Sequence, residues 1–219
     1  DKYEALIKQC IAFTKSHNHL VTLGIKPTKA STGYGYIQYD EENTEGGFYK
    51  VKTFTEKPDL EIAQTFLKSG DFLWNSGMFV WKTKDILDAL HKHLPEVIDC
   101  FNEAREAYYT PREKEAIAKV YSQCTNISID YGVMEKAENV YTIPSQFGWS
   151  DVGSWDSLYE VYEHDYWGNA VKGKNVKIYD SMNNMIMVGD QKMVVVQGIK
   201  NLCVVDTADV LLICERTKE

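Results

Sequence analysis

The sequence lacks the cysteine pattern, the long apolar run and the basic character that would each point to a specialised class of protein. Its 219 residues contain five cysteines, which are widely separated and include no Cys-x-x-Cys pair. A structural zinc cage or a secreted disulfide framework is therefore not expected, and reduced thiols in the cytoplasm are the simplest interpretation. No apolar run approaches the length of a membrane span, so we expect no membrane partner.

Positive charge is also scarce. The chain has 24 Lys and Arg against 32 Asp and Glu, which gives a formal net charge of -8. A nucleic-acid backbone normally requires a basic face, so we expect no nucleic-acid partner. If a phosphorylated substrate binds, local cations or a metal ion must offset the negative field of the protein.

Strand and helix patterns alternate over residues 1–165, which predicts an α/β domain. Apolar residues at helical spacing favour helices, and short apolar or alternating runs favour strands. Helices are predicted over residues 3–13, 58–69, 83–93, 95–108 and 111–123, and strands over 20–25, 35–39, 48–54 and 72–81. The second and third strands are expected to pair, and the fourth is expected to break at Asn75-Ser76-Gly77.

Residues 166–219 have a different pattern, with short apolar runs separated by Asp, Asn and Gly. The runs cover residues 176–179, 185–188, 193–196, 202–205 and 210–213. We interpret them as a small all-β extension, of either the β-solenoid (β-helix) or the meander type, because the internal repeat is too weak to choose between the two.

One carboxylate stands out, that of Asp151 in the string Gly-Trp-Ser-Asp-Val-Gly-Ser-Trp over residues 148–155. Glycine weakens both helices and strands, so the string predicts a stiff loop that presents Asp151. On residue types alone, a second interpretation has about equal weight: Asp151 caps the helix predicted over residues 155–162.

Three further segments combine polar groups with backbone freedom. The turn Gly33-Tyr34-Gly35 lets a ligand approach the main chain, although a bulge would use the same residues. Glu56 and Lys57 lie where a strand ends, so both can face one ligand; a solvated strand end is the alternative. Asn75-Ser76-Gly77 places an amide in an apolar strand, where a ligand hydroxyl or a neighbouring loop must satisfy it.

Six segments follow one another in a specific order along nearly the whole chain. They read Thr-Leu-Gly-Ile-Lys-Pro (22–27), Thr-Gly-Tyr-Gly-Tyr-Ile (32–37), Phe-Thr-Glu-Lys-Pro (54–58), Trp-Asn-Ser-Gly-Met-Phe (74–79), Ser-Ile-Asp-Tyr-Gly-Val-Met-Glu-Lys (128–136) and Gly-Trp-Ser-Asp-Val-Gly-Ser-Trp (148–155). In this order they resemble the motifs of the mannose-1-phosphate guanylyltransferase family. The resemblance implies part of a Rossmann-like nucleotidyltransferase domain with a mixed sheet, followed by a C-terminal β extension.

The same resemblance implies a reaction and a set of site residues. A guanylyl group would pass from GTP to mannose 1-phosphate in the presence of Mg²⁺, giving GDP-mannose and pyrophosphate. Lys57 and Asp151 would be catalytic, with Asp151 as a Mg²⁺ ligand and Lys57 on the sugar phosphate. Glu56 would bind a sugar hydroxyl, the Gly35 N–H would bind the mannose, and so would the Asn75 amide.

The implied substrate pocket also includes flanking residues, namely Gly33, Tyr34, Ser76, Gly77, Asp130 and Tyr131. Asp130 and Tyr131 are expected to shape the sugar pocket. Residue types cannot show the stereochemistry of a sugar, so two alternatives remain. One is a nucleotidyltransferase for another hexose 1-phosphate, and the other is a non-catalytic scaffold that binds a sugar phosphate.

Two parts of the family pattern are not found in the sequence. These are a glycine-rich loop with Arg and Lys that cradles GTP, and an Asp-His segment that supplies a second metal carboxylate. Residues 1–17 resemble the helix that follows the Asp-His segment, so we interpret the chain as the sugar-binding half of a truncated domain. We therefore expect the chain alone to be inactive and its parent protein to be the enzyme. A truncated sheet would expose an edge, which would favour a homodimer.

Overall fold

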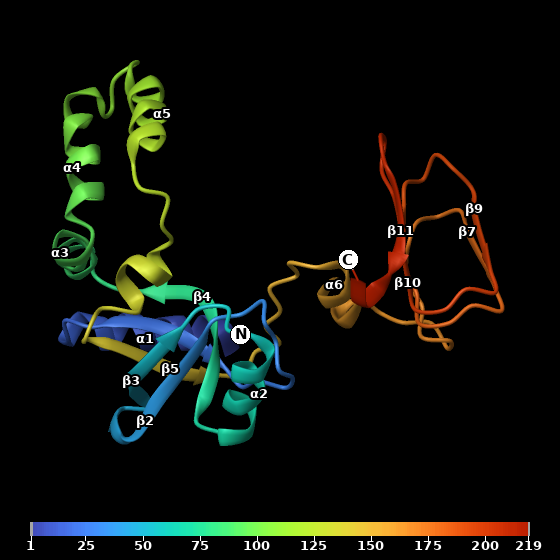
Figure 1. Ribbon diagram of the computed structural model, residues 1–219, viewed down its shortest axis with the longest axis horizontal. Helices are drawn as coiled ribbons and strands as arrows, with labels where there is room; N and C mark the ends of the chain where they lie inside the picture. The colour runs from blue at the N-terminus through green and yellow to red at the C-terminus, as the bar shows by residue number, and fades with distance from the viewer. Residues whose placement is uncertain (1, 219) are drawn as a thin grey trace. The chain divides into compact units, whose positions relative to one another are not determined.

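The computed structural model describes residues 2–218, which form two compact units that divide between Trp149 and Ser150 (Figure 1). The sequence placed a domain boundary after residue 165. The contacts instead group residues 150–165 with the second unit, because helix α6 (Trp155–Val161) packs through Trp155 and Leu158 against Met185 and its neighbours there. Within residues 2–218, none of the helices has the length and hydrophobicity of a membrane-spanning segment.

Five strands of the first unit close into a ring. They are β1 (Leu20–Ile25), β2 (Tyr36–Glu45), β3 (Phe48–Thr55), β4 (Phe72–Val80) and β5 (Val140–Ser145). The ring order is β1-β4-β2-β3-β5, and only the β5–β1 pair is parallel. The predicted pairing of the second and third strands is confirmed. The exposed edge that we expected in this sheet is not found among the described residues of the first unit, because each strand of the ring pairs on both sides.

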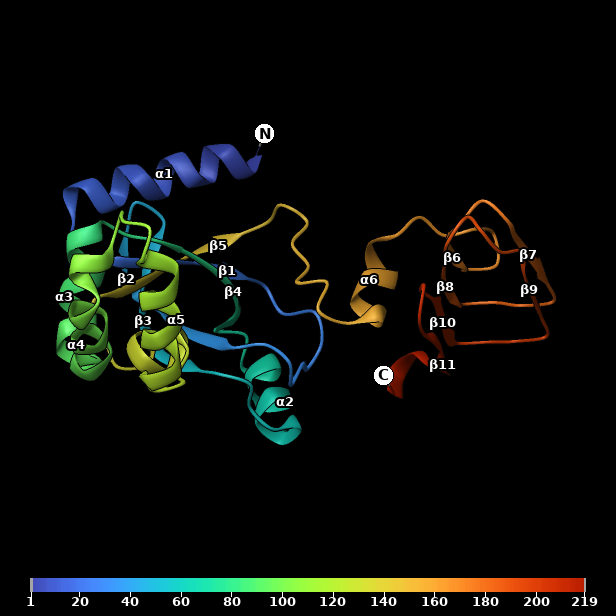
Figure 2. The same cartoon turned by 90° about the horizontal axis from the view of Figure 1, so that it is seen from above.

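The helices of the first unit pack against this ring or extend from one end of it (Figure 1 and Figure 2). They are α1 (Lys2–Ser16), α2 (Leu60–Ser69), α3 (Thr83–His93), α4 (Pro95–Glu103) and α5 (Glu113–Gln123), with the short turns η1 (Arg105–Ala107) and η2 (Asp130–Met134). Figure 2 shows α1 running along one side of the ring, with α3, α4 and α5 gathered at one end. The helix predicted over residues 95–108 is shorter than expected, because α4 ends at Glu103 and the chain continues as η1.

Local sequence signals account for the ends of α2. The Asp59 carboxylate accepts a hydrogen bond from the Ile62 N–H (2.9 Å), which satisfies an otherwise unpaired donor of the first turn. Gly70 ends the helix in the left-handed conformation, with φ of 83°. This helix follows the end of β3, where Glu56 and Lys57 lie, and precedes β4, which carries Asn75.

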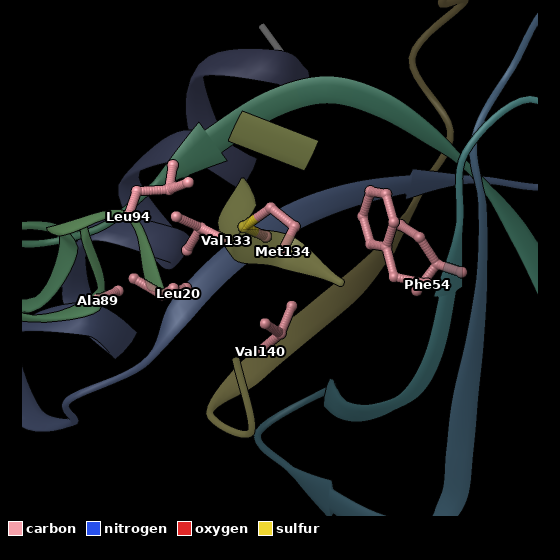
Figure 3. Packing of buried hydrophobic residues seen from close by; sticks show 8 residues of the cluster. Leu20, Phe54, Ala89, Leu94, Val133, Met134 and Val140 are labelled. Atoms are coloured by element: carbon pink, nitrogen blue, oxygen red, sulfur yellow. The ribbon is translucent and has the colours of Figure 1, made fainter. Parts of the chain in front are cut away.

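The largest core of the first unit lies between the ring, α3 and η2. Figure 3 shows its members, which are Leu20, Ile37, Phe54, Ala89, Leu94, Val133, Met134 and Val140; all but Ile37 are labelled there. Burial of this apolar surface fixes η2 against the ring. The position of Asp130, the first residue of η2, is therefore set by the core beneath it.

A second core lies under α1, where Cys10 and Phe13 pack against β1 and Phe48. Cys10 is fully buried, and burial raises the pKa of its thiol from 9.0 to about 11. Above pH 9 the unfolded chain loses this proton while the folded state keeps it. The stability that the buried neutral thiol contributes is present below pH 9 and is lost as the pH rises toward 11.

We therefore expect Cys10 to make alkaline stability pH-dependent. The difference in unfolding free energy between the wild-type protein and Cys10→Ala should shrink by about 2 kcal/mol between pH 8.5 and pH 10.5. Urea unfolding of both proteins at several pH values measures this difference. All other titratable groups are the same in the two proteins, so their contributions cancel. Parallel pH profiles for the two proteins would contradict the expectation.

The second unit is a small coil of β-strands. It contains β6 (Ala170–Lys172), β7 (Val176–Tyr179), β8 (Met185–Val188), β9 (Val194–Gln197), β10 (Leu202–Asp206) and β11 (Leu211–Glu215), followed by η3 (Arg216–Lys218). Strands β6, β8 and β10 pair in parallel, as do β7 and β9, and only β11 pairs antiparallel. Parallel neighbours one coil apart are typical of a solenoid, whereas a meander would pair antiparallel. The solenoid alternative is therefore the one that the structure contains.

Buried asparagines link successive coils of this unit. Asn184 donates from its backbone N–H (3.1 Å) and from Nδ2 (2.9 Å) to Oδ1 of Asn169. Its own Oδ1 accepts from the Leu202 N–H (2.9 Å) in the next coil. Both asparagines are almost completely buried, so this ladder satisfies backbone donors that would otherwise be unpaired at the corners of the coil.

Candidate functional site

The pairing of β2 with β4 brings Gly35 and Asn75 together. Tyr36 lies opposite Trp74 in this ladder, and the Asn75 N–H donates to the Gly35 carbonyl oxygen at 2.7 Å. A Cβ atom on Gly35 would overlap the Glu56 carboxylate and lie 3.3 Å from Cβ of Asn75. Only glycine therefore allows these two side chains to close over the main chain at this point.

The expected break in the fourth strand is a bulge, not an interruption. Strand β4 is continuous from Phe72 to Val80, but Thr22 pairs with Phe79 while Gly24 pairs with Asn75. Between these two pairs, residues 76–78 of β4 lie opposite the single residue Leu23 of β1. Gly77 takes a left-handed φ of 70° within the bulge, which turns its N–H back onto Oδ1 of Asn75 at 3.2 Å.

The Asn75 side chain is held from three sides. Its Oδ1 accepts from the Thr22 hydroxyl (3.0 Å) as well as from the Gly77 N–H. Its Nδ2 donates to Oδ1 of Asp130 at 2.9 Å. Thr22 is fully buried and Asn75 is 9% exposed, so these bonds form in a dry environment where an unpaired amide would be unfavourable.

Glu56 lies just beyond the end of β3, next to Gly35. Its N–H donates to Oε1 of Glu135 (3.2 Å), and its side chain is 11% exposed. Oε2 of Glu56 is buried and has no hydrogen-bond partner within residues 2–218. A buried acceptor without a donor is unfavourable, which favours a bound group that donates a hydrogen bond at this position.

Lys57 places a cation beside this carboxylate. Its Nζ lies 3.3 Å from Oε1 of Glu56, and its side chain is 61% exposed. The backbone of Lys57 has a positive φ of 45°, which is uncommon outside glycine, so the chain turns sharply between β3 and α2. The sharp turn allows both adjacent charges to face the same side, as the sequence predicted for a strand that has ended.

The electrostatic environment of Glu56 is mixed. Burial raises the pKa of its carboxyl above the ordinary value, and the negative charges of Asp130 and Glu135 act in the same direction. The hydrogen bond and charge of Lys57 oppose these effects. The site therefore combines an acceptor that lacks a donor, an amide held in place and an accessible cation, which suits a ligand with both hydroxyl groups and an anion.

Other predicted site residues have partners of their own. The Gly33 N–H donates to the Ser31 hydroxyl (3.2 Å), and the Tyr131 N–H donates to the Ser128 hydroxyl (3.4 Å). Ser76 accepts a hydrogen bond from the Met78 N–H (3.2 Å), which stabilises the bulge. These contacts support the loops around the site, and direct contact with a ligand remains a prediction for these residues.

Tyr34 packs in an aromatic cluster. Its ring meets Trp74 edge to face at 4.9 Å between ring centroids, and Trp149 at 5.4 Å. Nε1 of Trp74 is buried without a hydrogen-bond partner within residues 2–218. The cluster fixes the loop before Gly35 and adds a second polar atom that a ligand or a water molecule could satisfy.

Asp151 belongs to the second unit and is exposed. The following helix α6 is capped by Ser154, whose hydroxyl accepts from the Ser157 N–H at 3.1 Å in a reciprocal capping box. The interpretation of Asp151 as the helix cap is therefore wrong, because Ser154 occupies that position. A Cβ on Gly153 would lie 2.6 Å from Oδ2 of Asp151, so the carboxylate lies against this glycine. The stiff loop expected here includes the positive φ of Val152, 44°.

The arrangement of the side chains that could bind a metal ion limits the kind of metal site. No group of three or more His, Cys, Asp or Glu side chains within residues 2–218 could hold a metal ion. A structural metal cage is thus not formed by the described residues. Mg²⁺ often takes only one or two protein carboxylates and obtains its other ligands from phosphates and water, and the exposed Asp151 carboxylate fits that role.

Sequence reasoning missed two residues that hold the site together. Thr22 orients Asn75, and Glu135 accepts from the backbone of Glu56. Both lie inside two of the six ordered segments that resemble family motifs, residues 22–27 and 128–136. Their roles depend on strand register and on the position of η2, which a single sequence does not show.

Comparisons with known proteins agree with this architecture. Residues 1–166 match the family model described as nucleotidyl transferase. A mannose-1-phosphate guanylyltransferase from Klebsiella pneumoniae is 38% identical over 203 residues, which cover 91% of this chain and 43% of that protein. The alginate biosynthesis protein AlgA from Pseudomonas syringae pv. tomato is 39% identical over 207 residues, 94% of this chain and 42% of that protein. The chain thus spans less than half the length of these curated relatives.

A solved structure is also similar. The crystal structure described as mannose-1-phosphate geranyltransferase from Thermus thermophilus aligns with a TM-score of 0.83 and 29% identity, over 99% of this chain and 61% of that one. The likeness includes the C-terminal strands, so the predicted α/β domain with a β extension is confirmed. The resemblance in the six motifs is confirmed by relatives that carry the corresponding name. The chain belongs to the nucleotidyl transferase family.

Proposed function

We propose that the first unit binds mannose 1-phosphate and that the protein containing this chain makes GDP-mannose by guanylyl transfer from GTP. The observation that carries the proposal is the buried Oε2 of Glu56, which lacks a donor and lies beside Gly35 in the same site as Asn75 and Lys57. A sugar hydroxyl would supply the missing donor. The names of the relatives supply the sugar, and a cytoplasmic location is part of the same proposal.

The reaction requires alignment of two phosphorylated molecules more than it requires covalent chemistry by the protein. A phosphate oxygen of mannose 1-phosphate would attack the α-phosphorus of GTP, and the bond to pyrophosphate would break. Glu56 and Asn75 would orient the sugar, the Gly35 N–H would donate to it, and Lys57 would neutralise its phosphate. Such positioning lowers the barrier because the reacting atoms are held in line.

Mg²⁺ belongs to the proposal because nucleotidyl transferases as a family generally use a divalent metal. Bound Mg²⁺ supplies positive charge that stabilises the phosphates and the departing pyrophosphate. In this chain the Asp151 carboxylate would be its protein ligand. The single carboxylate should bind the ion only weakly when no phosphates are present, since the remaining ligands must come from substrate and water.

Calorimetric titration with mannose 1-phosphate tests the proposal. Lys57→Met should weaken the binding of mannose 1-phosphate about tenfold, because a charge-assisted contact with the phosphate is lost. The affinity for mannose without its phosphate, measured by competition, should not change. Lys68→Met, which removes an exposed cation from the last turn of α2, is the matched control and should bind like the wild-type protein.

The ligand panel separates the alternatives. Glucose 1-phosphate and mannose 6-phosphate are titrated beside mannose 1-phosphate, and mannose 1-phosphate should bind most tightly. Tighter binding of glucose 1-phosphate would assign the site to another hexose. Absence of binding for all three compounds would reject the proposed function.

A further inference from the structure

A line of hydrogen bonds runs from β1 through Asn75 to η2. The Thr22 hydroxyl donates to Oδ1 of Asn75 (3.0 Å), and Nδ2 of Asn75 donates to Oδ1 of Asp130 (2.9 Å). Thr22 and Asn75 come from neighbouring strands, whereas Asp130 comes from a turn fixed by the core. The amide is therefore held by three elements that are far apart in the sequence.

The chemistry of the neighbours fixes which end of the amide faces which way. The Gly77 N–H is only a donor, so it requires the oxygen of Asn75, which it meets at 3.2 Å. The Asp130 carboxylate accepts at this point, so it requires the nitrogen, which donates to its Oδ1. A flipped amide would set donor against donor at Gly77 and acceptor against acceptor at Asp130, which makes the flipped state unfavourable on both sides.

The simplest alternative is that Asn75 is purely structural, with all its hydrogen-bonding groups paired within the protein. Two observations argue against this alternative. The hydrogen bonds described for residues 2–218 use only one of the two Nδ2 hydrogens of Asn75. The side chain also lies beside Gly35, against which the carboxylate of Glu56 closes with an oxygen that lacks a donor. The amide oxygen, in contrast, already accepts two hydrogen bonds. A ligand in this site would thus meet an N–H of Asn75 and not its carbonyl.

We propose that Thr22 is a positioning residue for substrate, which together with Asp130 holds the Asn75 amide so that it offers an N–H donor to one sugar hydroxyl oxygen. The inference rests on the proposed function, because the hydroxyl belongs to the sugar phosphate. Thr22 itself is fully buried behind Asn75 and does not touch the ligand. Asp130 acts through the same amide, and its Oδ1 is used in holding Nδ2.

Removal of the Thr22 hydroxyl takes away one of the two hydrogen bonds that Oδ1 of Asn75 accepts. Thr22→Val keeps the shape of the side chain but leaves Oδ1 of Asn75 with the Gly77 N–H as its remaining donor. The amide should then rotate more freely without flipping, because Asp130 and Gly77 still oppose the flipped state. Thr22→Ser restores the hydroxyl and is the conservative rescue.

The test combines these variants with monodeoxy analogues of mannose 1-phosphate, titrated calorimetrically into the full 219-residue chain. In the wild-type protein, the analogue that lacks the hydroxyl bound by Asn75 should bind at least fivefold more weakly than mannose 1-phosphate. This analogue is identified with Asn75→Ala, because only for this analogue should the variant bind the analogue and mannose 1-phosphate with similar affinity. Thr22→Val should bind mannose 1-phosphate about fivefold more weakly and reduce the difference for this analogue to less than twofold, whereas Thr22→Ser should keep both values.

The outcomes separate this inference from the proposed function. If the wild-type protein binds mannose 1-phosphate and Thr22→Val shows the same affinity and the same analogue pattern, the inference is overturned and the proposed function stands. A Thr22→Ser variant that behaves like Thr22→Val would also overturn it, because a structural role alone would then explain both.

If the wild-type protein does not bind the sugar phosphate, the proposed function fails and the positioning is tested without a ligand. Nitrogen-15 relaxation of the Asn75 side-chain amide should show greater mobility in Thr22→Val than in Thr22→Ser or the wild-type protein. Equal mobility in all three proteins would overturn the inference.

Discussion

Gly24→Ala should lower the free energy of unfolding of the first unit by about 3 kcal/mol, the upper end of the range for overpacking a close-packed interior. Gly24 is the fifth of the six residues of β1, which lies between β4 and β5. A Cβ atom there would lie 2.5 Å from Cδ1 of Leu73 and 2.7 Å from Oγ1 of Thr142. Leu73 could move its terminal methyl group, but its Cβ, at 3.0 Å, could not move without displacing β4.

The measurement must separate the two units, because a chain with two compact units need not unfold in one step. Urea unfolding followed by backbone amide resonances reports β1 and β10 separately, and only the resonances of β1 should shift to lower urea. Gly33→Ala is the matched control, since the nearest atom to its new Cβ would be the Ser31 hydroxyl at 3.7 Å. Equal stability of Gly24→Ala and the control would show that β1 and β4 can separate at little cost.

Most of the secondary structure follows from local pattern. The strands predicted from apolar runs agree with the structure to within a few residues, as at residues 20–25 and 185–188. Strands β5 and β6 were not predicted. The ring closure could not be predicted in this way, because it depends on which strands pair. The parallel contact of β1 with β5 joins residues more than 100 positions apart, from Leu20 to Val140.

The candidate site was predictable in its residue types but not in its connections. Asn75 stands out because an amide interrupts an apolar strand, and Glu56 and Lys57 stand out because two charges lie side by side where a strand ends. The bulge in β4 gives Gly77 a structural role, because it directs the Gly77 N–H to Oδ1 of Asn75. Sequence patterns locate such a glycine but do not show where its N–H points, because this depends on the register between β1 and β4.

The residues that orient the site were hidden for a different reason. Thr22 occupies a buried strand position, where threonine is common and carries no functional signal. Its hydroxyl matters only because β4 places Asn75 beside it. For Asp151, in contrast, the deciding signal is local in the sequence. Ser154 and Ser157 form a reciprocal capping pair at the start of α6, so Asp151 is not needed as the helix cap.

Glu56→Gln should reduce the affinity for mannose 1-phosphate by about 10- to 100-fold and at the same time stabilise the protein without ligand at neutral pH. The loss follows from replacing a charged acceptor of a sugar hydroxyl by a neutral one, since hydrogen bonds to charged groups contribute about 1.5–3 kcal/mol. The gain in stability follows from the raised pKa of the Glu56 carboxyl, which results first from burial and then from Asp130 and Glu135.

The sign of the stability effect depends on pH. A carboxyl whose pKa is raised in the folded state favours folding when it is protonated, below its unfolded pKa of about 4.5, and this contribution is lost as the pH rises through the folded value. The melting temperature of Glu56→Gln should therefore exceed that of the wild-type protein at pH 7, and the difference should shrink as the pH falls toward 4. Glu61→Gln, on the exposed first turn of α2, is the matched control and should change neither affinity nor the pH profile in this way.

A Glu56→Gln protein that is more stable but no longer binds the sugar phosphate would show that the buried carboxylate serves ligand binding and lowers the free energy of unfolding. Such a trade-off is common at functional sites. Loss of both binding and stability would instead show that Lys57, at 3.3 Å, makes the charge of Glu56 part of the structure. Unchanged binding would remove Glu56 from the site. The orphaned Oε2 would then be satisfied by water, and the proposal for the sugar pocket would have to rest on Asn75 and Lys57 alone.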